Sequence, residues 1–284
     1  MNIDEAYGRC EEITATQARN FSYGIRLLPP PKRRAMSALY AMARRIDDIG
    51  DGDAAPPAKL AGLAGVRKSL AAVANRAPID EADPVLVALS DVAARYPLPL
   101  DALDELVDGC EMDVSGTDYQ TFEELVGYCR RVAGTVGRLS LSIYGTGSLE
   151  RARPLADALG VALQVTNILR DVVEDRETMG RVYLPVEDRE RFGVTADLEG
   201  PRDGLVALIA YEAARAEPWY DQGLALLPLL DWRSRACTAA MAGIYRQILL
   251  RIQHDPASVL RGRISLSGAR KASVALRALT RGTA

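Results

Sequence analysis

Apolar residues recur every three to four positions through most of the chain, the spacing that places them on one face of an α-helix. No segment sustains the alternation of apolar and polar residues that is typical of a half-buried strand. Glycine and proline gather in two segments, 52–57 and 193–204, which we expect to be loops. The pattern predicts one all-α domain over residues 1–284, with helices near residues 4–18, 31–51, 57–75, 82–95, 99–115, 121–145, 149–176, 203–228, 231–253 and 267–280.

Several helix starts carry their own signals. The prolines at 29–31 precede Lys-Arg-Arg, and proline favours the first helical turn. Asp101 and Thr121 are expected N-caps, and Glu124 completes a capping box with Thr121.

Composition narrows the protein class. Hydrophobic residues make up 48% of the chain and charged residues 26%, as in ordinary globular proteins. The net charge of −3 gives no support to a nucleic-acid partner. The four cysteines lack a C-x-x-C pair, so we interpret them as buried residues in a reducing compartment. A single histidine, His254, argues against most histidine-built metal sites.

Nothing in the sequence predicts export or a membrane span. The N-terminal residues MNIDEAYGRCEE lack the basic and then apolar pattern of a signal peptide, and no apolar run reaches 18 residues. We expect a cytoplasmic protein. Contact with the membrane periphery stays open, because the C-terminal segment is rich in arginine, although a solvated helix is the preferred interpretation.

The first unusual segment reads YAMARRIDDIGD, residues 40–51. At about 100° per residue, four polar side chains fall on one narrow face of this helix: Tyr40, Arg44, Asp47 and Asp51. Asp48 lies beside them, and the other faces are largely apolar. The helix is therefore predicted to be buried around a polar stripe.

A second helix repeats this design. The segment LGVALQVTNILRDVVED places a stripe on one face that consists of Gln164, Asn167, Asp171 and Asp175. The remaining positions are almost all apolar, which is typical of a buried helix. Buried carboxylates need a cationic partner, because an unpaired buried charge is very costly.

Two interpretations fit a single acidic stripe. Such stripes are usually solvated faces with Asp–Arg ion pairs. Two stripes of the same kind on apolar helices instead indicate a carboxylate-walled cleft inside the bundle. Carboxylate oxygens suit Mg²⁺, and nearby arginines supply donors for a diphosphate: Arg44, Arg45, Arg170 and Arg181. Apolar walls then predict a substrate with a hydrocarbon tail. A carboxylate-bridged di-iron site is rejected, because it needs Glu-x-x-His pairs.

Five segments in order resemble the squalene and phytoene synthase family, the head-to-head prenyl synthases, from about residue 10 to residue 270. They are ARNFSYGIRLLP, YAMARRIDDIGD, YCRRVAGTVGRLS, LQVTNILRDVVED and GRVYLP. The resemblance implies an isoprenoid synthase-type helical bundle with a central apolar cavity. It also implies several Mg²⁺ ions in each site.

The resemblance assigns roles by position. It implies a metal-binding set of Asp47, Asp48, Asp51, Asn167, Asp171 and Asp175. It implies contacts to diphosphate from Arg19, Tyr40, Arg44, Gln164, Asn167, Arg181, Tyr245 and Arg263. Tyr128 would lie beside the reacting carbons as a proton shuttle, and Tyr183 would border the site with Arg181. Tyr128 and Tyr245 also admit a second interpretation, as core aromatics with a hydroxyl at the edge.

Within the family, residues 18–52 most resemble bacterial presqualene diphosphate synthases of the hopanoid-type squalene route. These join two farnesyl diphosphates, release diphosphate and stop at the cyclopropyl intermediate, so NADPH is not expected. Four alternatives stay open: a phytoene or dehydrosqualene synthase, a complete squalene synthase, a partner enzyme that converts presqualene diphosphate to hydroxysqualene, and a family-derived scaffold without activity. Downstream isoprenoid enzymes are conceivable partners.

Overall fold

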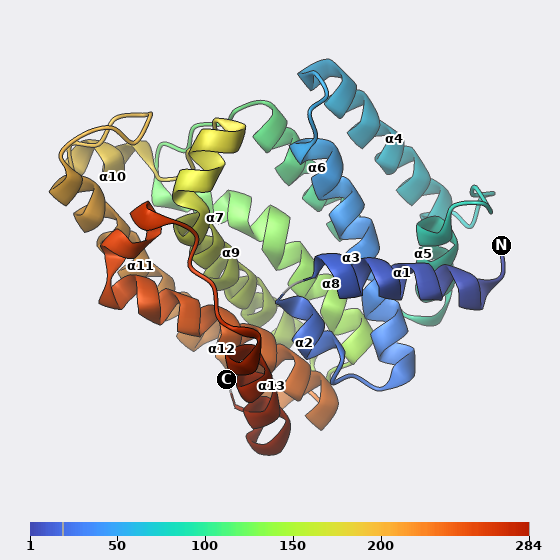
Figure 1. The fold of residues 1–284 in the computed structure, drawn as a ribbon. Coiled ribbons are helices and arrows are strands. Elements are labelled where there is room, and N and C mark those ends of the chain that lie inside the picture. The colour runs from blue at the N-terminus through green and yellow to red at the C-terminus, as the bar shows by residue number, and fades with distance from the viewer. Residues whose placement is uncertain (19, 284) are drawn as a thin grey trace.

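The computed structural model describes residues 1–18 and 20–283, and the side chain of Arg281 is not described. The expected diphosphate contact of Arg19 lies outside the described residues. The described chain contains helices and loops without a strand (Figure 1). Its elements are α1 (Ile3–Gln17), α2 (Phe21–Ile25), α3 (Pro30–Asp51), α4 (Pro56–Ala74), α5 (Pro84–Arg95), α6 (Asp101–Val114), α7 (Phe122–Cys129), the π-helical turn η1 (Arg130–Gly134), α8 (Thr135–Tyr144), α9 (Leu149–Met179), α10 (Val186–Arg191), α11 (Arg202–Leu224), the 3₁₀ turn η2 (Leu227–Leu229), α12 (Trp232–His254), the 3₁₀ turn η3 (Pro256–Arg261) and α13 (Gly268–Arg281).

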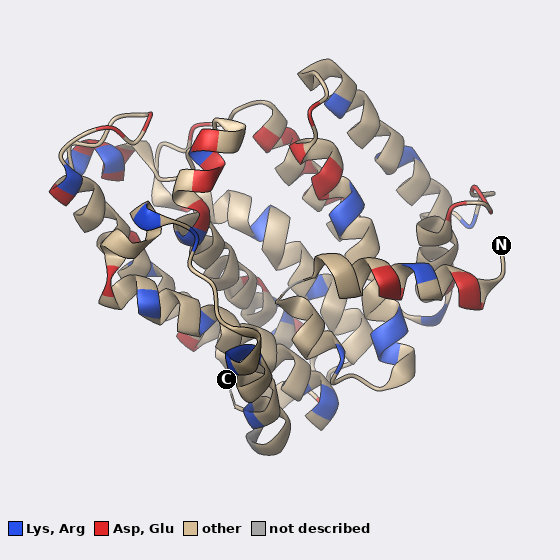
Figure 2. Cartoon of the chain, in the orientation of Figure 1, with Lys and Arg blue, Asp and Glu red and all other residues tan. Residues whose placement is uncertain are grey.

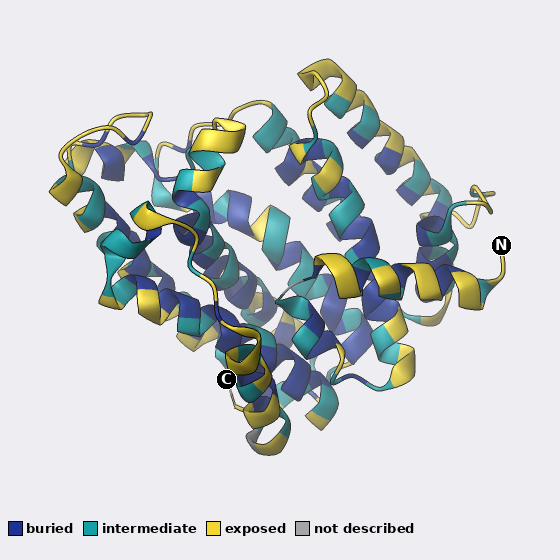
Figure 3. Ribbon diagram, in the orientation of Figure 1, coloured by how far each residue is buried: buried dark blue, intermediate teal, exposed yellow. Residues whose placement is uncertain are grey.

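Helix α9 runs through the middle of the bundle. It packs against α8, α11, α12 and η1, while α1, α4 and α5 lie on one side of the molecule and α10 lies on the other (Figure 1). Buried residues line the inward faces of the helices, and exposed residues lie on the outer turns and loops (Figure 3). This arrangement confirms the all-α prediction. Among the described residues, no helix has the length and apolar character that crossing a bilayer requires.

The helix ends follow the expected caps in part. Thr121 caps α7 by accepting a hydrogen bond from the backbone N–H of Glu124, as predicted. The Glu124 carboxylate accepts from the backbone N–H of Gln120 rather than from that of Thr121, so the box is displaced by one residue. The prediction that Asp101 is an N-cap is wrong, because Asp101 is the first residue of α6. There its charge still stabilises the positive end of the helix dipole.

The single helix predicted over residues 121–145 contains a π-helical turn. The turn η1 joins α7 to α8, and this stretch meets α9 at unusually close range. A Cβ on Gly160 would lie 2.6 Å from the backbone nitrogen of Gly134, and one on Gly137 would lie 2.8 Å from the carbonyl oxygen of Ala156. Only glycine permits this backbone contact. Periodicity did not predict η1, nor the short helices α2 and α10.

Helices α3 and α9 run in the same general direction. Near their first turns, the Lys32 ammonium group donates to the carbonyl oxygen of Tyr144, shortly before α9 begins. Beyond their last turns, Arg181 donates to Asp51 Oδ1 at 2.6 Å. The two acidic stripes therefore lie at the same end of the bundle, where Figure 2 shows acidic residues on both helices.

Candidate active site

A cavity of about 220 Å³ lies between α3, α8 and α9. Its α3 wall consists of Met36, Leu39, Tyr40, Ala43, Arg44 and Asp47, and its α9 wall consists of Ala156, Leu159, Gly160, Leu163, Gln164 and Asn167. Spacings of three and four residues keep each set on one helix face. Each wall spans eleven residue steps, which corresponds to about 16 Å of helix. The cavity is thus elongated, with a shape suited to a hydrocarbon tail.

Charged and amide side chains occupy only one end of the two walls. The side chains of Arg44 and Asp47 end the α3 wall, and those of Gln164 and Asn167 end the α9 wall. The opposite end is closed by largely apolar groups, which include Leu141, Tyr144, Leu226 and Met241. A ligand with one charged end and one oily end matches this polarity.

The side-chain oxygen of Asn167 is buried and has no hydrogen-bond partner. An orphaned acceptor of this kind costs free energy in a folded protein and calls for an explanation. Asn167 lines the cavity and lies one helical turn before Asp171. An amide oxygen beside carboxylates is a ligand set that fits a hard divalent cation.

Two carboxyl groups of the stripes carry raised pKa values. Burial, followed by the charge of Asp51, raises the pKa of Asp47 to about 7. Burial, followed by the charge of Asp171, raises the pKa of Asp175 to about 7, and Asp51 contributes to this shift as well. The stripes are therefore close enough to repel each other across the two helices. The site holds more negative charge than its own arginines offset.

Within the described residues, no three acidic, histidine or cysteine side chains converge closely enough to hold a metal by themselves. Mg²⁺ typically binds through one or two carboxylates together with substrate phosphates, so a divided carboxylate set fits it. The donor set therefore suits Mg²⁺ that arrives with a diphosphate.

Arginines surround the second stripe. The buried guanidinium group of Arg170 makes two hydrogen bonds to the carboxylate of Asp171. Arg263 approaches the same carboxylate from the loop after η3, with Nε 3.0 Å from Oδ1, and its Nη1 lies 3.2 Å from Glu174. The ring of Tyr245 lies 5.9 Å from the guanidinium carbon of Arg170. Two cations thus already balance Asp171.

Arg181, in the segment that follows α9, binds the last turn of α3, which carries the first stripe. Arg181 donates to Asp51 Oδ1 and also to the carbonyl oxygen of Gly50, at 3.1 Å. Asp48 points to the half-exposed side of α3, where its carboxylate pairs with Arg44 at 2.5 Å, and it does not line the cavity. The end of α3 and the segment after α9 therefore form one connected rim.

The expectation that Arg45 contributes to diphosphate binding is wrong. Its guanidinium group makes two hydrogen bonds, of 2.6 and 2.8 Å, to the carboxylate of Asp83. Asp83 also caps α5, so this ion pair fixes the packing of α5 against α3. Arg44 and Arg45 are adjacent in sequence, but a rotation of about 100° per residue separates their roles.

Asp113, on α6, is a site residue that the sequence did not reveal. Its carboxylate accepts hydrogen bonds from the hydroxyl groups of Tyr128 and Tyr183, each at 2.9 Å. The two rings stack with their centroids 5.2 Å apart. Asp113 belongs to no acidic stripe, so helical periodicity gave no signal for it. Tyr128 is buried, its hydroxyl donates to this carboxylate, and it is not one of the residues that line the cavity.

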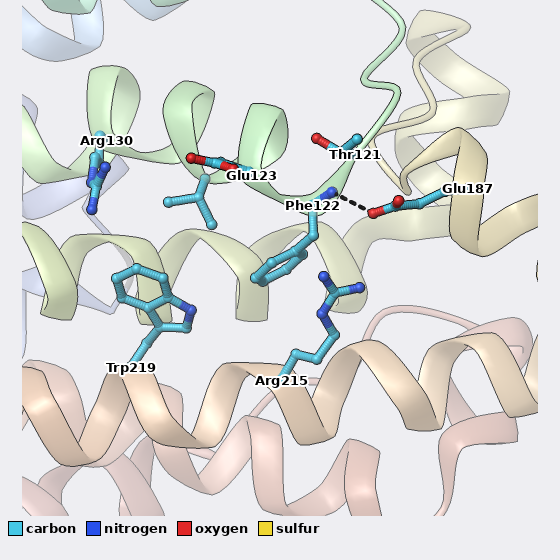
Figure 4. A pocket seen from close by; sticks show the side chains of 8 residues that line it. Thr121, Phe122, Glu123, Arg130, Glu187, Arg215 and Trp219 are labelled. Carbon is cyan, nitrogen blue, oxygen red and sulfur yellow. Dashed lines mark hydrogen bonds between the residues drawn. The ribbon is translucent and has the colours of Figure 1, made fainter.

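A second hollow, of about 490 Å³, lies on the surface between α7, α10 and α11 (Figure 4). The guanidinium group of Arg215 lies 3.7 Å from the ring centroid of Phe122, and Trp219 forms a neighbouring wall. Neither acidic stripe reaches this hollow. The cavity between α3 and α9 is therefore the candidate active site.

Known proteins share both the sequence and this architecture. The family model for squalene/phytoene synthase matches residues 14–270. A phytoene synthase of Mycobacterium tuberculosis is 51% identical over 283 residues, covering 98% of this chain and 91% of that protein. A phytoene synthase of Arthrospira platensis is 37% identical over 278 residues, covering 91% of this chain and 87% of that protein.

Solved structures agree. The crystal structure of a dehydrosqualene synthase superimposes with a TM-score of 0.87 at 31% identity, covering 97% of this chain and 95% of that one. Squalene synthase HpnC from Alicyclobacillus acidocaldarius gives a TM-score of 0.78 at 31% identity, covering 89% and 94% of the two chains. The chain therefore belongs to the squalene/phytoene synthase family of prenyltransferases.

Proposed function

We propose that this protein is a phytoene synthase, which joins two geranylgeranyl diphosphates head to head with release of diphosphate. The observation that carries the proposal is the pair of polar stripes on α3 and α9, from which Arg44, Asp47, Gln164 and Asn167 line one end of an elongated apolar cavity. The choice of product is supported by relatives named phytoene synthase, at 51% and 37% identity over nearly the whole chain. Synthesis of presqualene diphosphate is the second candidate.

The metal-binding role is proposed for five oxygen donors: Asp47, Asp51, Asn167, Asp171 and Asp175. Bound Mg²⁺ would act as a Lewis acid that stabilises the charge on the departing diphosphate. The unpartnered oxygen of Asn167 and the raised pKa values of Asp47 and Asp175 support this assignment. Asp48, which the resemblance also implies as a ligand, has the least support, because it pairs with Arg44 outside the cavity.

The remaining polar residues would bind and orient the diphosphate: Tyr40, Arg44, Gln164, Arg181, Tyr245 and Arg263. Guanidinium groups make charge-assisted hydrogen bonds to phosphate oxygens, and these strengthen as negative charge develops. The apolar walls exclude water, which would otherwise capture the allylic cation. Tyr128 would take the proton that is lost when the cyclopropane ring closes.

A second candidate is the condensation of two farnesyl diphosphates to presqualene diphosphate or dehydrosqualene. It is favoured by the likeness to a dehydrosqualene synthase, with a TM-score of 0.87, and to squalene synthase HpnC. Both candidates use the same acidic stripes and differ in the length of the hydrocarbon tail.

Product analysis tests the proposal. Purified protein is incubated with Mg²⁺ and either geranylgeranyl or farnesyl diphosphate, without NADPH, and the products are separated by chromatography with mass detection. Phytoene is the expected product. Presqualene diphosphate or dehydrosqualene as the main product would select the second candidate.

Two variants serve as controls for the metal-binding role. Asp47→Asn and Asp171→Asn should abolish turnover while circular dichroism reports an intact fold. Wild-type rates from either variant would remove the proposed metal cleft. No product from either substrate with folded wild-type protein would favour a scaffold without activity.

A further inference from the structure

Asp113 holds two tyrosine hydroxyl groups at once, one on each carboxylate oxygen. Tyr128 donates to Oδ2 and Tyr183 donates to Oδ1, both at 2.9 Å. Tyr128 comes from α7 and Tyr183 from the segment after α9, so one side chain of α6 joins two separate parts of the site. A carboxylate that accepts two hydrogen bonds fixes the rotation of both hydroxyl groups.

The direction of these bonds determines what Tyr128 can offer to a substrate. Its phenol proton points to Asp113, so the free lone pair of its oxygen is available as an acceptor. Tyr119 provides an internal contrast. Its ring lies 5.3 Å from that of Tyr128, yet its buried hydroxyl has no hydrogen-bond partner. Among these stacked tyrosines, Asp113 therefore orients Tyr128 and Tyr183 specifically.

The surroundings of Asp113 connect it to the acidic rim. Charged and titratable groups surround it from several elements: Asp47 and Asp51 on α3, Cys110 on α6, Tyr119 before α7, Tyr128 and Cys129 on α7, and Arg181 and Tyr183 on the segment after α9. Burial raises the pKa of Asp113 to about 6, although Arg181 and the two hydroxyl groups oppose this shift. Near neutral pH the carboxylate is therefore mostly ionised, yet it is more basic than an ordinary aspartate. Such a group can both accept a hydrogen bond and receive a proton.

We infer that Asp113 is a positioning residue that acts through Tyr128 and receives the phenol proton when Tyr128 takes a proton from the substrate. This inference rests on the proposed function. As the cyclopropane ring closes, the electron pair of the broken C–H bond forms the new C–C bond. The proton passes to the oxygen of Tyr128, whose own proton passes to Asp113. The neutral carboxyl group later returns the proton to solvent, so the charges balance.

A double-mutant cycle tests the inference. Asp113→Asn keeps the size of the side chain, but it replaces one acceptor oxygen with a donor. We expect kcat to fall by about 100-fold, as on loss of a general base, while KM changes by less than threefold. Tyr128→Phe should cause a similar loss. In the Tyr128→Phe background, Asp113→Asn should then cost almost nothing further, because the two residues act as a unit.

Two further measurements separate this role from a structural one. The acid limb of the kcat profile should shift between wild type and Asp113→Asn, because the variant lacks the group that receives the proton. Tyr119→Phe is the matched control, because it removes a stacked hydroxyl that Asp113 does not hold. It should keep wild-type kcat within about twofold, since its hydroxyl has no partner to lose.

The experiment distinguishes failure of the role of Asp113 from failure of the proposed function. Diphosphate release is measured with both farnesyl and geranylgeranyl diphosphate, so the assay does not depend on the identity of the product. Wild-type protein that is inactive on both substrates would overturn the proposed function. Active wild-type protein with an unaffected Asp113→Asn variant, or with additive losses in the cycle, would overturn the role of Asp113. If Asp113→Asn does not fold, wild-type kcat in Tyr128→Phe would overturn it equally.

Discussion

Replacing Asp47 by asparagine should make the metal-free protein more stable while it removes activity. The side chain lies at the polar end of the cavity, and burial together with Asp51 raises the pKa of Asp47 to about 7. The folded state therefore holds this proton more tightly than the unfolded chain does. The stabilisation that comes from the protonated form is complete at low pH, and it is lost as pH rises through about 7.

The expected gain in stability of Asp47→Asn follows from the raised pKa of Asp47. Raising the pKa of Asp47 by about three units corresponds to about 4 kcal/mol of lost stability at pH 8. We expect the asparagine variant to recover about 2 kcal/mol, because relaxation of the surroundings reduces the effective cost of a buried charge. For a chain of 284 residues this is a rise in melting temperature of about 3 °C. The gain should shrink by more than half at pH 5.

The assay is thermal and urea unfolding at pH 5, 7 and 8 with a metal chelator present. Asp83→Asn is the matched control, because Arg45 lowers the pKa of Asp83 and its neutralisation should destabilise the protein. Adding Mg²⁺ with a non-hydrolysable prenyl diphosphate should reverse the order, since wild-type protein alone gains binding energy. A metal-free Asp47→Asn variant less stable than wild type at pH 8 would refute the reasoning.

Three further predictions follow from the packing and the charges. Asn167→Ala removes the side-chain oxygen that has no partner in the cavity wall. Calorimetry should then show that the Mg²⁺-dependent affinity for a diphosphate analogue falls by about 10-fold or more. Unchanged affinity would contradict the ligand role. Gly223→Ala would bring a Cβ within 2.6 Å of the Leu159 backbone and should cost about 2 kcal/mol or more in urea melts. Gly65→Ala, with open space around it, should gain about 0.5–1 kcal/mol instead, and equal midpoints for the two variants would contradict the packing argument. Burial raises the pKa of Glu212 to about 8, so its protonated form stabilises the fold at low pH and this contribution is lost as pH rises through 8. Glu212→Gln should therefore gain stability over wild type as pH rises from 4.5 to about 8 and keep that gain at higher pH, and a difference that does not vary with pH would count against it.

Helical periodicity predicted the part of the site that repeats along a helix. The stripes on α3 and α9 could be predicted because polar residues at every third or fourth position of an apolar helix fall on one face of that helix. The same regularity placed Tyr40 and Gln164 on the cavity walls, where the structure has them. Short elements carry too few turns for this signal, which explains why α2 and α10 were missed.

Tertiary partners could not be predicted in this way. In the sequence Arg45 is equivalent to Arg44. In the structure, however, the guanidinium group of Arg45 donates to the carboxylate of Asp83, which is distant in sequence. Asp113 gave no signal, because its importance comes from two tyrosines on other segments. Sequence patterns thus predict which face of a helix is polar, while packing determines which group that face meets.

The π-helical turn η1 has a consequence for how this site tolerates insertions and deletions. It separates the Tyr128 side of α7 from the cavity-lining residues Val136 and Ser140 of α8. A π-helical turn holds one residue more than an α-helical turn, so removing one residue from Arg130–Gly134 would restore an ordinary helix with almost no net rotation of the two halves. Removing one residue from the α-helical part on either side would instead rotate Tyr128 and the cavity wall by about 100° relative to each other. The turn is therefore the place in this segment where the chain can lose one residue and still keep both halves facing as they do.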